Sequence, residues 1–216
     1  MLTANEKLLL DYYKKTGKPI KLNIGCRNKI FPNFINLDIN PENKLADIID
    51  NGFTLEKFED NSISLIYSSH VFEHLDYKEG EQALKVWYNK LKPGGIVRVS
   101  VPCAIKAAAL MILTGDRVHK ALFMGRQREG DQWDYHRNIF TKEWLTTDLE
   151  NAGFVDVKEW NPHEEWPHYF VDDFSRATYP TFSGKIRRDD GKIVDLGGVN
   201  VSLNLQAFKP LNKNVW

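Results

Sequence analysis

The 216-residue sequence has little of what marks a secreted or membrane-bound protein. It contains only two cysteines, Cys26 and Cys103, which provide no disulfide framework and are typical of a reducing compartment. No apolar run approaches the roughly 18 residues that a membrane-spanning helix needs, and the first residues lack the pattern of a signal peptide. We therefore expect a cytoplasmic protein without a membrane partner.

An excess of charge of either sign is also missing. Lys and Arg together number 29, as do Asp and Glu, so the formal net charge is zero. Proteins that bind long nucleic acids usually carry a basic excess, because contacts with phosphates supply much of their affinity. We therefore expect no nucleic-acid partner. The length favours one domain over residues 1–216 rather than two full domains.

Short apolar runs rich in β-branched residues recur along the chain, and helical patterns separate several of them. Such runs are typical of strands that are covered on both faces, so the pattern predicts a layered α/β fold with a parallel sheet. The predicted strands are Ile20–Ile24, Phe34–Leu37, Ala46–Ile49, Ile63–Tyr67, Ile96–Val101, Phe154–Trp160 and Val199–Phe208. One predicted helix begins at the capping box of Thr3 and Glu6, and another, which includes Ala83, Leu84 and Trp87, ends before Lys92-Pro-Gly-Gly95. Two more begin at Ala104 and at Thr141.

The connection between the first two predicted strands is unusually short. Only residues 25–33 separate them, and Pro32 is among these. A parallel crossover usually needs at least ten to twelve residues. We therefore expect the connecting helix to be cut to about one turn or replaced by a loop.

Two further segments carry aromatic and charged residues without a clear period. We expect residues 115–138 and 161–198 to form a substrate lid or insertion. Within the second segment, Asp189-Asp190-Gly191 is a turn signal between Lys185–Arg188 and Lys192–Leu196, and it predicts a hairpin.

The most informative motif is the run from Lys21 to Arg27, together with Asp38 at the end of the next apolar run. A buried strand that enters a tight glycine turn brings backbone N–H groups close to a ligand. An acidic residue at the tip of the neighbouring strand accepts hydrogen bonds from a ribose diol. The two features together predict a site for a nucleoside cofactor.

Several motifs in order resemble the Rossmann-like, class I methyltransferases that depend on S-adenosylmethionine (SAM), and more narrowly their type 11 group. The motifs are Leu22-Asn-Ile-Gly-Cys26, Phe58-Glu-Asp-Asn-Ser62, Leu65-Ile-Tyr-Ser-Ser-His-Val-Phe-Glu-His-Leu75, Leu91-Lys-Pro-Gly-Gly95, Tyr135-His-Arg137, Phe140-Thr-Lys-Glu-Trp-Leu145 and Ala152-Gly-Phe154. The resemblance implies a seven-stranded, mostly parallel sheet with helices on both faces and an antiparallel last strand. It also implies SAM as the cofactor, bound at the carboxyl ends of the strands.

The resemblance places the cofactor residues at the ends of the first four strands. We expect Asn23, Gly25 and Cys26 at the methionine end, Asp38 at the ribose, Asp50 at the adenine amino group, and Ser68 and Ser69 near the sulfonium. Asp47 is the alternative to Asp50, and a helix cap or a loop charge is the plain alternative for either. The family usually has glycine where this chain has Arg27, whose side chain would either crowd SAM or point outward.

An oxygen acceptor usually needs a base to remove its proton during methyl transfer. We predict His136 as this base and Arg137 as an anchor for the acceptor, with His70 as the alternative base. The competing interpretation is that His136 only packs beneath the following helix. We expect Glu73 and His74 to support the start of a helix.

No metal site is expected from the sequence. The histidines and glutamates of residues 163–168 lack the His-Glu-x-x-His spacing, and Pro167 interrupts any helix that would align them.

The predicted function is transfer of a methyl group from SAM to oxygen in a small polar or glycan-like acceptor. A catalytically silent module that binds SAM or a nucleoside on the same fold is the alternative. A nucleotide-dependent oxidoreductase would show Gly-x-Gly-x-x-Gly, which the sequence lacks.

Overall fold

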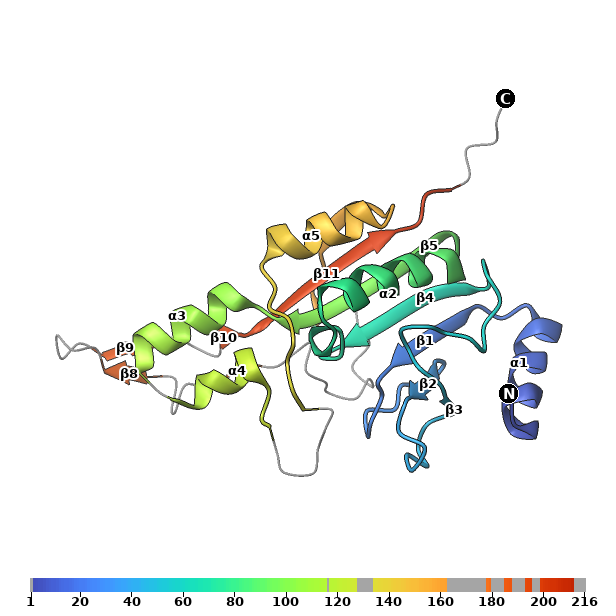
Figure 1. Cartoon of the computed structure of the whole chain (residues 1–216), viewed down its shortest axis with the longest axis horizontal. Helices are drawn as coiled ribbons and strands as arrows, with labels where there is room; N and C mark the ends of the chain where they lie inside the picture. The colour runs from blue at the N-terminus through green and yellow to red at the C-terminus, as the bar shows by residue number, and fades with distance from the viewer. Residues whose placement is uncertain are drawn as a thin grey trace.

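The structure, a computed structural model, describes residues 2–115, 117–127, 134–162, 178–179, 185–187, 193–195 and 199–211. Its centre is a seven-stranded sheet in the order β3-β2-β1-β4-β5-β11-β6. Figure 1 labels β1 to β5 and β11 of this sheet. The strands of this sheet are β1 (Ile20–Ile24), β2 (Ile35–Asp38), β3 (Ile48–Ile49), β4 (Ile63–Ser69), β5 (Leu91–Pro102), β6 (Val155–Glu159) and β11 (Ser202–Phe208). The α-helices are α1 (Ala4–Thr16), α2 (Tyr77–Lys90), α3 (Ala104–Thr114), α4 (Lys120–Met124) and α5 (Lys142–Asn151).

The pairing of the strands confirms the predicted fold class. Strands β3, β2, β1, β4 and β5 run parallel to one another, and β11 lies antiparallel between β5 and β6. Since parallel strands end at the same edge of a sheet, the residues that follow β1 to β4 are brought together. The predicted cofactor residues therefore share one edge.

The main core lies between the sheet and helices α2 and α5. Helix α2 begins at a capping box, in which Asp76 and Glu79 each accept a hydrogen bond from the other's backbone N–H. Its residues Ala83, Leu84 and Trp87 follow a helical period and are almost completely buried. These side chains cover the apolar residues of the central strands and make the sheet a rigid support for the edge where it ends.

A loop replaces the crossover helix between β1 and β2. No helix occurs in residues 25–34. The amide of Asn36 in β2 holds this loop: its Oδ1 accepts from Phe31 N at 2.8 Å and from Asn23 Nδ2 at 3.0 Å. Phe31 then packs against Phe34 and Tyr67, where a helix would otherwise bury apolar side chains. The prediction of a shortened connection is confirmed.

Helix α1 covers the short edge strand β3. Glu6 is only 5% exposed, and its carboxylate accepts hydrogen bonds from Lys57 Nζ at 2.8 and 3.0 Å and from the Ile49 N–H at 3.2 Å. Burial alone would raise the pKa of Glu6, but the hydrogen bonds from Lys57 and from backbone N–H groups lower it overall. The Glu6–Lys57 pair therefore provides a hydrogen-bond acceptor for the edge strand β3, on the side where no further described strand pairs with it.

The rest of the described chain adds small elements to this sheet. The 3-10 helices are η1 (Phe72–His74) and η2 (Arg117–His119). The predicted hairpin is confirmed by the antiparallel pairing of β8 (Lys185–Arg187) with β9 (Ile193–Asp195), while its turn lies outside the described residues. Strand β7 (Thr178–Tyr179) pairs with β10 (Val199–Asn200). The predicted last strand, Val199–Phe208, is therefore divided at Val201 into β10 and β11, which belong to different sheets.

The predicted lid remains a prediction. Its first segment contains η2 and α4 as well as the extended residues 134–139, whereas most of the second segment lies outside the described residues. No described helix combines the length and the apolar character that crossing a bilayer requires.

Candidate functional site

Four strand ends meet at the edge of the sheet where the cofactor is predicted. Gly25 follows β1, Asp38 ends β2, Asp50 follows β3, and Ser69 ends β4. The Asp50 N–H donates to the Asp38 carbonyl at 2.9 Å, so the two acidic residues are neighbours. The structure thus brings together residues that are far apart in the sequence.

The Asp38 carboxylate is in direct contact with the glycine turn. Its Oδ2 accepts from Arg27 N and from Asn43 Nδ2, each at 2.8 Å, and its Oδ1 accepts from Asn40 N at 3.0 Å. The side chain is 5% exposed. Asp38 therefore organises the turn and the following loop as well as marking the predicted ribose position.

Arg27 stands in a backbone conformation that explains the family's preference for glycine. Its φ is +44°, in the left-handed region that L-residues rarely adopt. The side chain is exposed. This exposure fits the outward orientation, one of the two considered from the sequence, and the effect of Arg27 on SAM remains a prediction.

Gly25 is required by packing as well as by conformation. Its φ is +66°, and a Cβ at this position would lie 2.4 Å from Cγ2 of Val71. Val71 belongs to the connection between β4 and η1. Any side chain at Gly25 would therefore push the end of β1 away from the residues after β4.

Asn23 and Cys26 support the turn from within the protein. Asn23 Nδ2 donates to Lys29 O at 2.7 Å, and Cys26 N donates to Leu37 O at 3.0 Å. Burial, followed by the charge of Asp38, raises the pKa of the Cys26 thiol to about 12. Their predicted roles in cofactor binding remain predictions, and the contacts described here hold the loop that replaces the crossover helix.

The two candidates for the adenine end differ in position. The Asp50 carboxylate accepts from the N–H groups of Asn51 and Lys57 at 2.9 and 3.2 Å, and burial raises its pKa. Asp47 Oδ2 instead accepts from both nitrogens of Asn36, at 2.8 and 2.9 Å. Asp47 therefore faces Asn36, which lies two positions before the end of β2. Asp50 follows the end of β3 directly and is better placed for the adenine amino group.

Ser68 and Ser69 present unused hydroxyl groups at the end of β4. Both Oγ atoms are buried and have no hydrogen-bond partner among the described residues. Buried hydroxyl groups normally have hydrogen-bond partners. A bound ligand could supply the missing partners of these two serines. They lie on the central strand, where the resemblance places the sulfonium.

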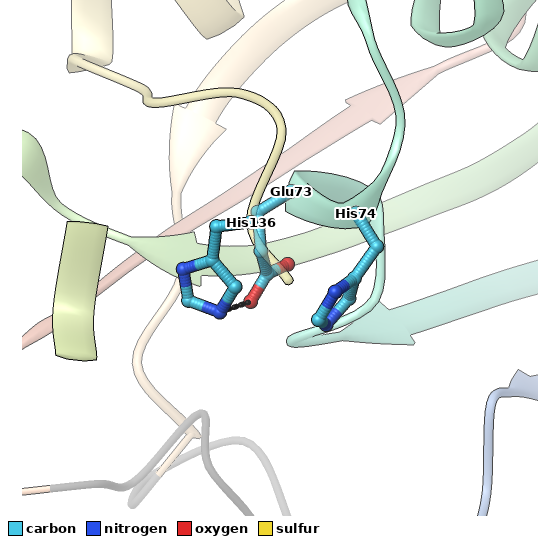
Figure 2. A group of neighbouring side chains, drawn as sticks. All are labelled: Glu73, His74 and His136. Atoms are coloured by element: carbon cyan, nitrogen blue, oxygen red, sulfur yellow. Dashed lines mark ion pairs between the residues drawn. The ribbon is translucent and has the colours of Figure 1, made fainter. Parts of the chain in front are cut away.

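Directly after β4, three imidazoles surround a buried carboxylate. Glu73 is 1% exposed, and its Oε1 lies 3.3 Å from His70 Nδ1 and 3.8 Å from His136 Nε2. Burial alone would raise the pKa of Glu73, but His70, then His74 and His136, lower it overall, so the group is an anion. Figure 2 shows the carboxylate between the rings of His74 and His136.

Backbone contacts hold His136 in this cluster. The carbonyl of Glu73 accepts from the N–H groups of Arg137 and Asn138 at 2.9 and 3.1 Å, and this attaches the extended segment 134–139 to η1. Burial lowers the pKa of His136, and the charge of Glu73 only partly opposes that effect. The predicted base thus lies near its predicted alternative, because His70 contacts the same carboxylate.

Arg137 is engaged with the protein itself. Its guanidinium donates to Glu79 at 2.6 Å and to Asp76 at 2.7 Å, and its side chain is 48% exposed. These are the two acidic residues of the capping box of α2. Two of its five donors therefore hold the segment 134–139 against that helix, and the role of acceptor anchor remains a prediction.

The comparisons with known proteins agree with this geometry. A family model described as "Methyltransferase domain" matches residues 15–159, about two thirds of the chain. The chain belongs to the class I SAM-dependent methyltransferases. The cofactor and the enzyme class predicted from the sequence are confirmed, and the narrower type 11 group remains a resemblance.

Solved methyltransferases have the same fold. A SAM-dependent methyltransferase from Archaeoglobus fulgidus is 18% identical, with a TM-score of 0.52 and coverage of 94% of each chain. One from Methanosarcina mazei is 15% identical, with a TM-score of 0.53 and coverage of 98% of this chain and 99% of that chain. No curated protein matches the sequence.

The residues of this methyltransferase fit SAM at the strand ends. The turn at Gly25 and the carboxylate of Asp38 are adjacent, Asp50 follows the neighbouring strand, and two orphaned hydroxyls end β4. A groove between α1 and residues 57–62 lies instead at the opposite edge, because its lining includes Ile20 at the start of β1. The strand ends, not that groove, carry the features of a cofactor site.

Sequence reasoning missed the part that Glu73 plays. In the sequence it appears as an acidic residue at the start of a helix, a common and unremarkable place for a carboxylate. The signal that was present is the pair Glu73-His74 directly after a strand that ends at the site. The partner His136 is 63 residues further on, so only the folded chain reveals the cluster.

Proposed function

We propose that this methyltransferase transfers the methyl group of SAM to a hydroxyl oxygen of a small polar or sugar-like acceptor. The observation that supports this proposal is the cluster of Glu73, His70, His74 and His136. It follows β4 immediately, beside the strand ends that fit the cofactor. Imidazoles in this position suit an acceptor whose proton must be removed.

The cofactor supplies an electrophilic methyl carbon on a sulfonium. The protein has to orient the acceptor, remove its proton and keep water out. In the proposed reaction an imidazole nitrogen takes the hydroxyl proton, the oxygen electron pair forms the bond to the methyl carbon, and the pair of the broken carbon–sulfur bond stays on sulfur. His136 is the first candidate for this imidazole and His70 is the second.

The proposal is tested by transfer of labelled methyl from SAM to a panel of hydroxyl and amine acceptors. We expect incorporation into a hydroxylated small molecule, and a His136→Gln variant that binds SAM normally but transfers methyl about 10²- to 10⁴-fold more slowly. Tyr135→Phe changes the exposed neighbouring side chain and is the matched control. Incorporation only into amines would refute oxygen as the acceptor atom. SAM binding without any transfer would favour the silent module.

A further inference from the structure

We propose that Glu73, His74 and His136 form a binding site for a divalent transition-metal cation. One carboxylate oxygen and one nitrogen from each ring all lie within 4.8 Å of one another (Figure 2). Glu73 and His74 come from η1, and His136 comes from the segment that the Glu73 carbonyl holds in place. The inference departs from the sequence-based expectation of no metal.

Both imidazoles have the hydrogen bond to a carbonyl that metal-binding histidines usually have. His74 Nδ1 lies 2.8 Å from the carbonyl of Tyr135, and His136 Nδ1 lies 3.1 Å from the carbonyl of Leu122. A carbonyl only accepts, so in each ring Nδ1 carries the proton and Nε2 is left with a lone pair. A hydrogen bond from the other ring nitrogen to a carbonyl is the common support of a metal-binding histidine.

The buried carboxylate is the second and independent observation. Glu73 is 1% exposed; its Oε1 has a close contact with His70 Nδ1 at 3.3 Å, whereas its Oε2 has no hydrogen-bond partner among the described residues. A buried carboxylate with an oxygen that accepts no hydrogen bond is costly unless a cation balances it. A protonated His70 or His136 is one such cation, but both of them contact Oε1 alone, and His136 Nε2 at 3.8 Å is too far for a hydrogen bond. A metal ion bound to one carboxylate oxygen would neutralise the buried charge and accept a lone pair from each imidazole.

The donor set indicates the kind of ion. Two imidazole nitrogens and one carboxylate oxygen suit Zn²⁺ and similar first-row ions better than Mg²⁺ or Ca²⁺, which prefer oxygen ligands alone. Ligands about 2.0–2.1 Å from a tetrahedral ion lie roughly 3.3 Å apart. The 3.8 Å between His136 Nε2 and Glu73 Oε1 would therefore shorten by about half an ångström on binding, and the widest pair of donor atoms, up to 4.8 Å apart, by up to about 1.5 Å.

Three protein ligands would leave a position of the ion open. If the proposed function is correct, the acceptor hydroxyl occupies this position and loses its proton more readily, as water does on a catalytic zinc ion. His136 would then be a ligand, and His70 would be the imidazole that takes the proton. Binding of the ion itself does not depend on the proposed function.

The test measures metal binding by the full chain without SAM. After treatment with a chelator, the protein is dialysed against Zn²⁺, and separately against Co²⁺, whose visible spectrum reports nitrogen and oxygen ligands. We expect one ion per chain, and at least about 100-fold weaker binding in Glu73→Gln and in His74→Gln. His74 is partly exposed, so its variant is the safer one for folding. Thermal melting of the unmodified protein with and without Zn²⁺ requires no variant and should show stabilisation.

A His163→Gln, His168→Gln double variant is the matched control, because it removes the two histidines that lie outside the described residues. It should bind Zn²⁺ as the unmodified chain does. Less than one ion per chain, or binding that survives Glu73→Gln and is lost in the control, would overturn the proposal. Methyl transfer by the metal-free protein would leave the proposed function intact and remove the ion's part in it. A chain that binds Zn²⁺ but transfers no methyl group would support the metal site and refute the proposed function.

Discussion

Replacing Asp38 with asparagine tests the cofactor site most directly. The carboxylate offers about four lone-pair positions. Oδ2 accepts from Arg27 N, from Asn43 Nδ2 and, at 3.9 Å, from Cys26 Sγ, whereas Oδ1 accepts from Asn40 N. One position on Oδ1 remains for a ribose hydroxyl. A hydrogen bond to a charged acceptor contributes about 1.5–3 kcal/mol, so Asp38→Asn should weaken SAM binding by about 10- to 150-fold. Calorimetric titration with SAM measures this change.

The same substitution also affects folding, because the new amide group must face at least one of these N–H donors. One unsatisfied donor costs about 1–3 kcal/mol, which urea unfolding followed by circular dichroism would detect. Asn43→Ala is the control: it removes a donor to Asp38 but leaves the carboxylate, so stability should fall while SAM affinity changes less than about threefold. If Asp38→Asn loses stability but keeps its SAM affinity within threefold, the carboxylate only organises the loop. The ribose would then be misplaced.

Two further predictions concern groups that support this edge. In a Cys103→Ser variant, Cys26 is the only thiol that a thiolate-specific reagent can label. At pH 8 the folded protein should react about 10³-fold more slowly than the protein unfolded in urea, because burial raises the pKa of Cys26 to about 12. Fast labelling of the folded protein would contradict this prediction. Glu6→Gln should lower the free energy of unfolding at pH 7 by about 2–4 kcal/mol, since it breaks a largely buried pair with Lys57. The pKa of Glu6 in the folded protein is below its usual 4.5, so the pair with Lys57 stabilises the protein fully above the pKa of the unfolded chain and ceases to do so as pH falls through the folded pKa. If Glu6→Gln lowers the free energy of unfolding equally at pH 7 and at pH 3, the ion pair is not the source of the stability.

The strands could be predicted from the sequence because they are short apolar runs, whereas the number of strands in the sheet and its antiparallel last strand were implied by the resemblance. The boundaries were less accurate where pairing continues past the apolar run. Strand β5 begins at Leu91 rather than at Ile96, because Leu91 pairs with Ile63 and residues 92–95 form an irregularity in the strand. The turn signal Lys92-Pro-Gly-Gly95 correctly predicts that the helix ends before it. It does not prevent the residues on both sides of it, Leu91 and Ile96, from pairing with β4.

The candidate site could be predicted only in part, and the division has a physical cause. Residues at strand ends, such as Gly25, Asp38 and Ser69, are predictable because the topology of a parallel sheet places them together. The cluster around Glu73 depends instead on two backbone hydrogen bonds from the segment 134–139. No local pattern encodes such a contact, so His136 was predicted from a resemblance and its carboxylate partner was missed.

The loop that replaces the crossover helix changes how this methyltransferase can hold the tail of SAM. In doubly wound folds, the helix that follows the first strand directs its N–H groups and its dipole toward an anionic part of the ligand. Residues 25–34 form no helix, and the N–H groups of Cys26 and Arg27 donate to Leu37 O and to Asp38. A helix terminus contributes about 0.3–1 kcal/mol, and up to about 2 kcal/mol in partly buried sites. The chain forgoes this contribution, so its affinity for SAM has to come more from the ribose and adenine ends, which makes Asp38 the residue whose loss should matter most.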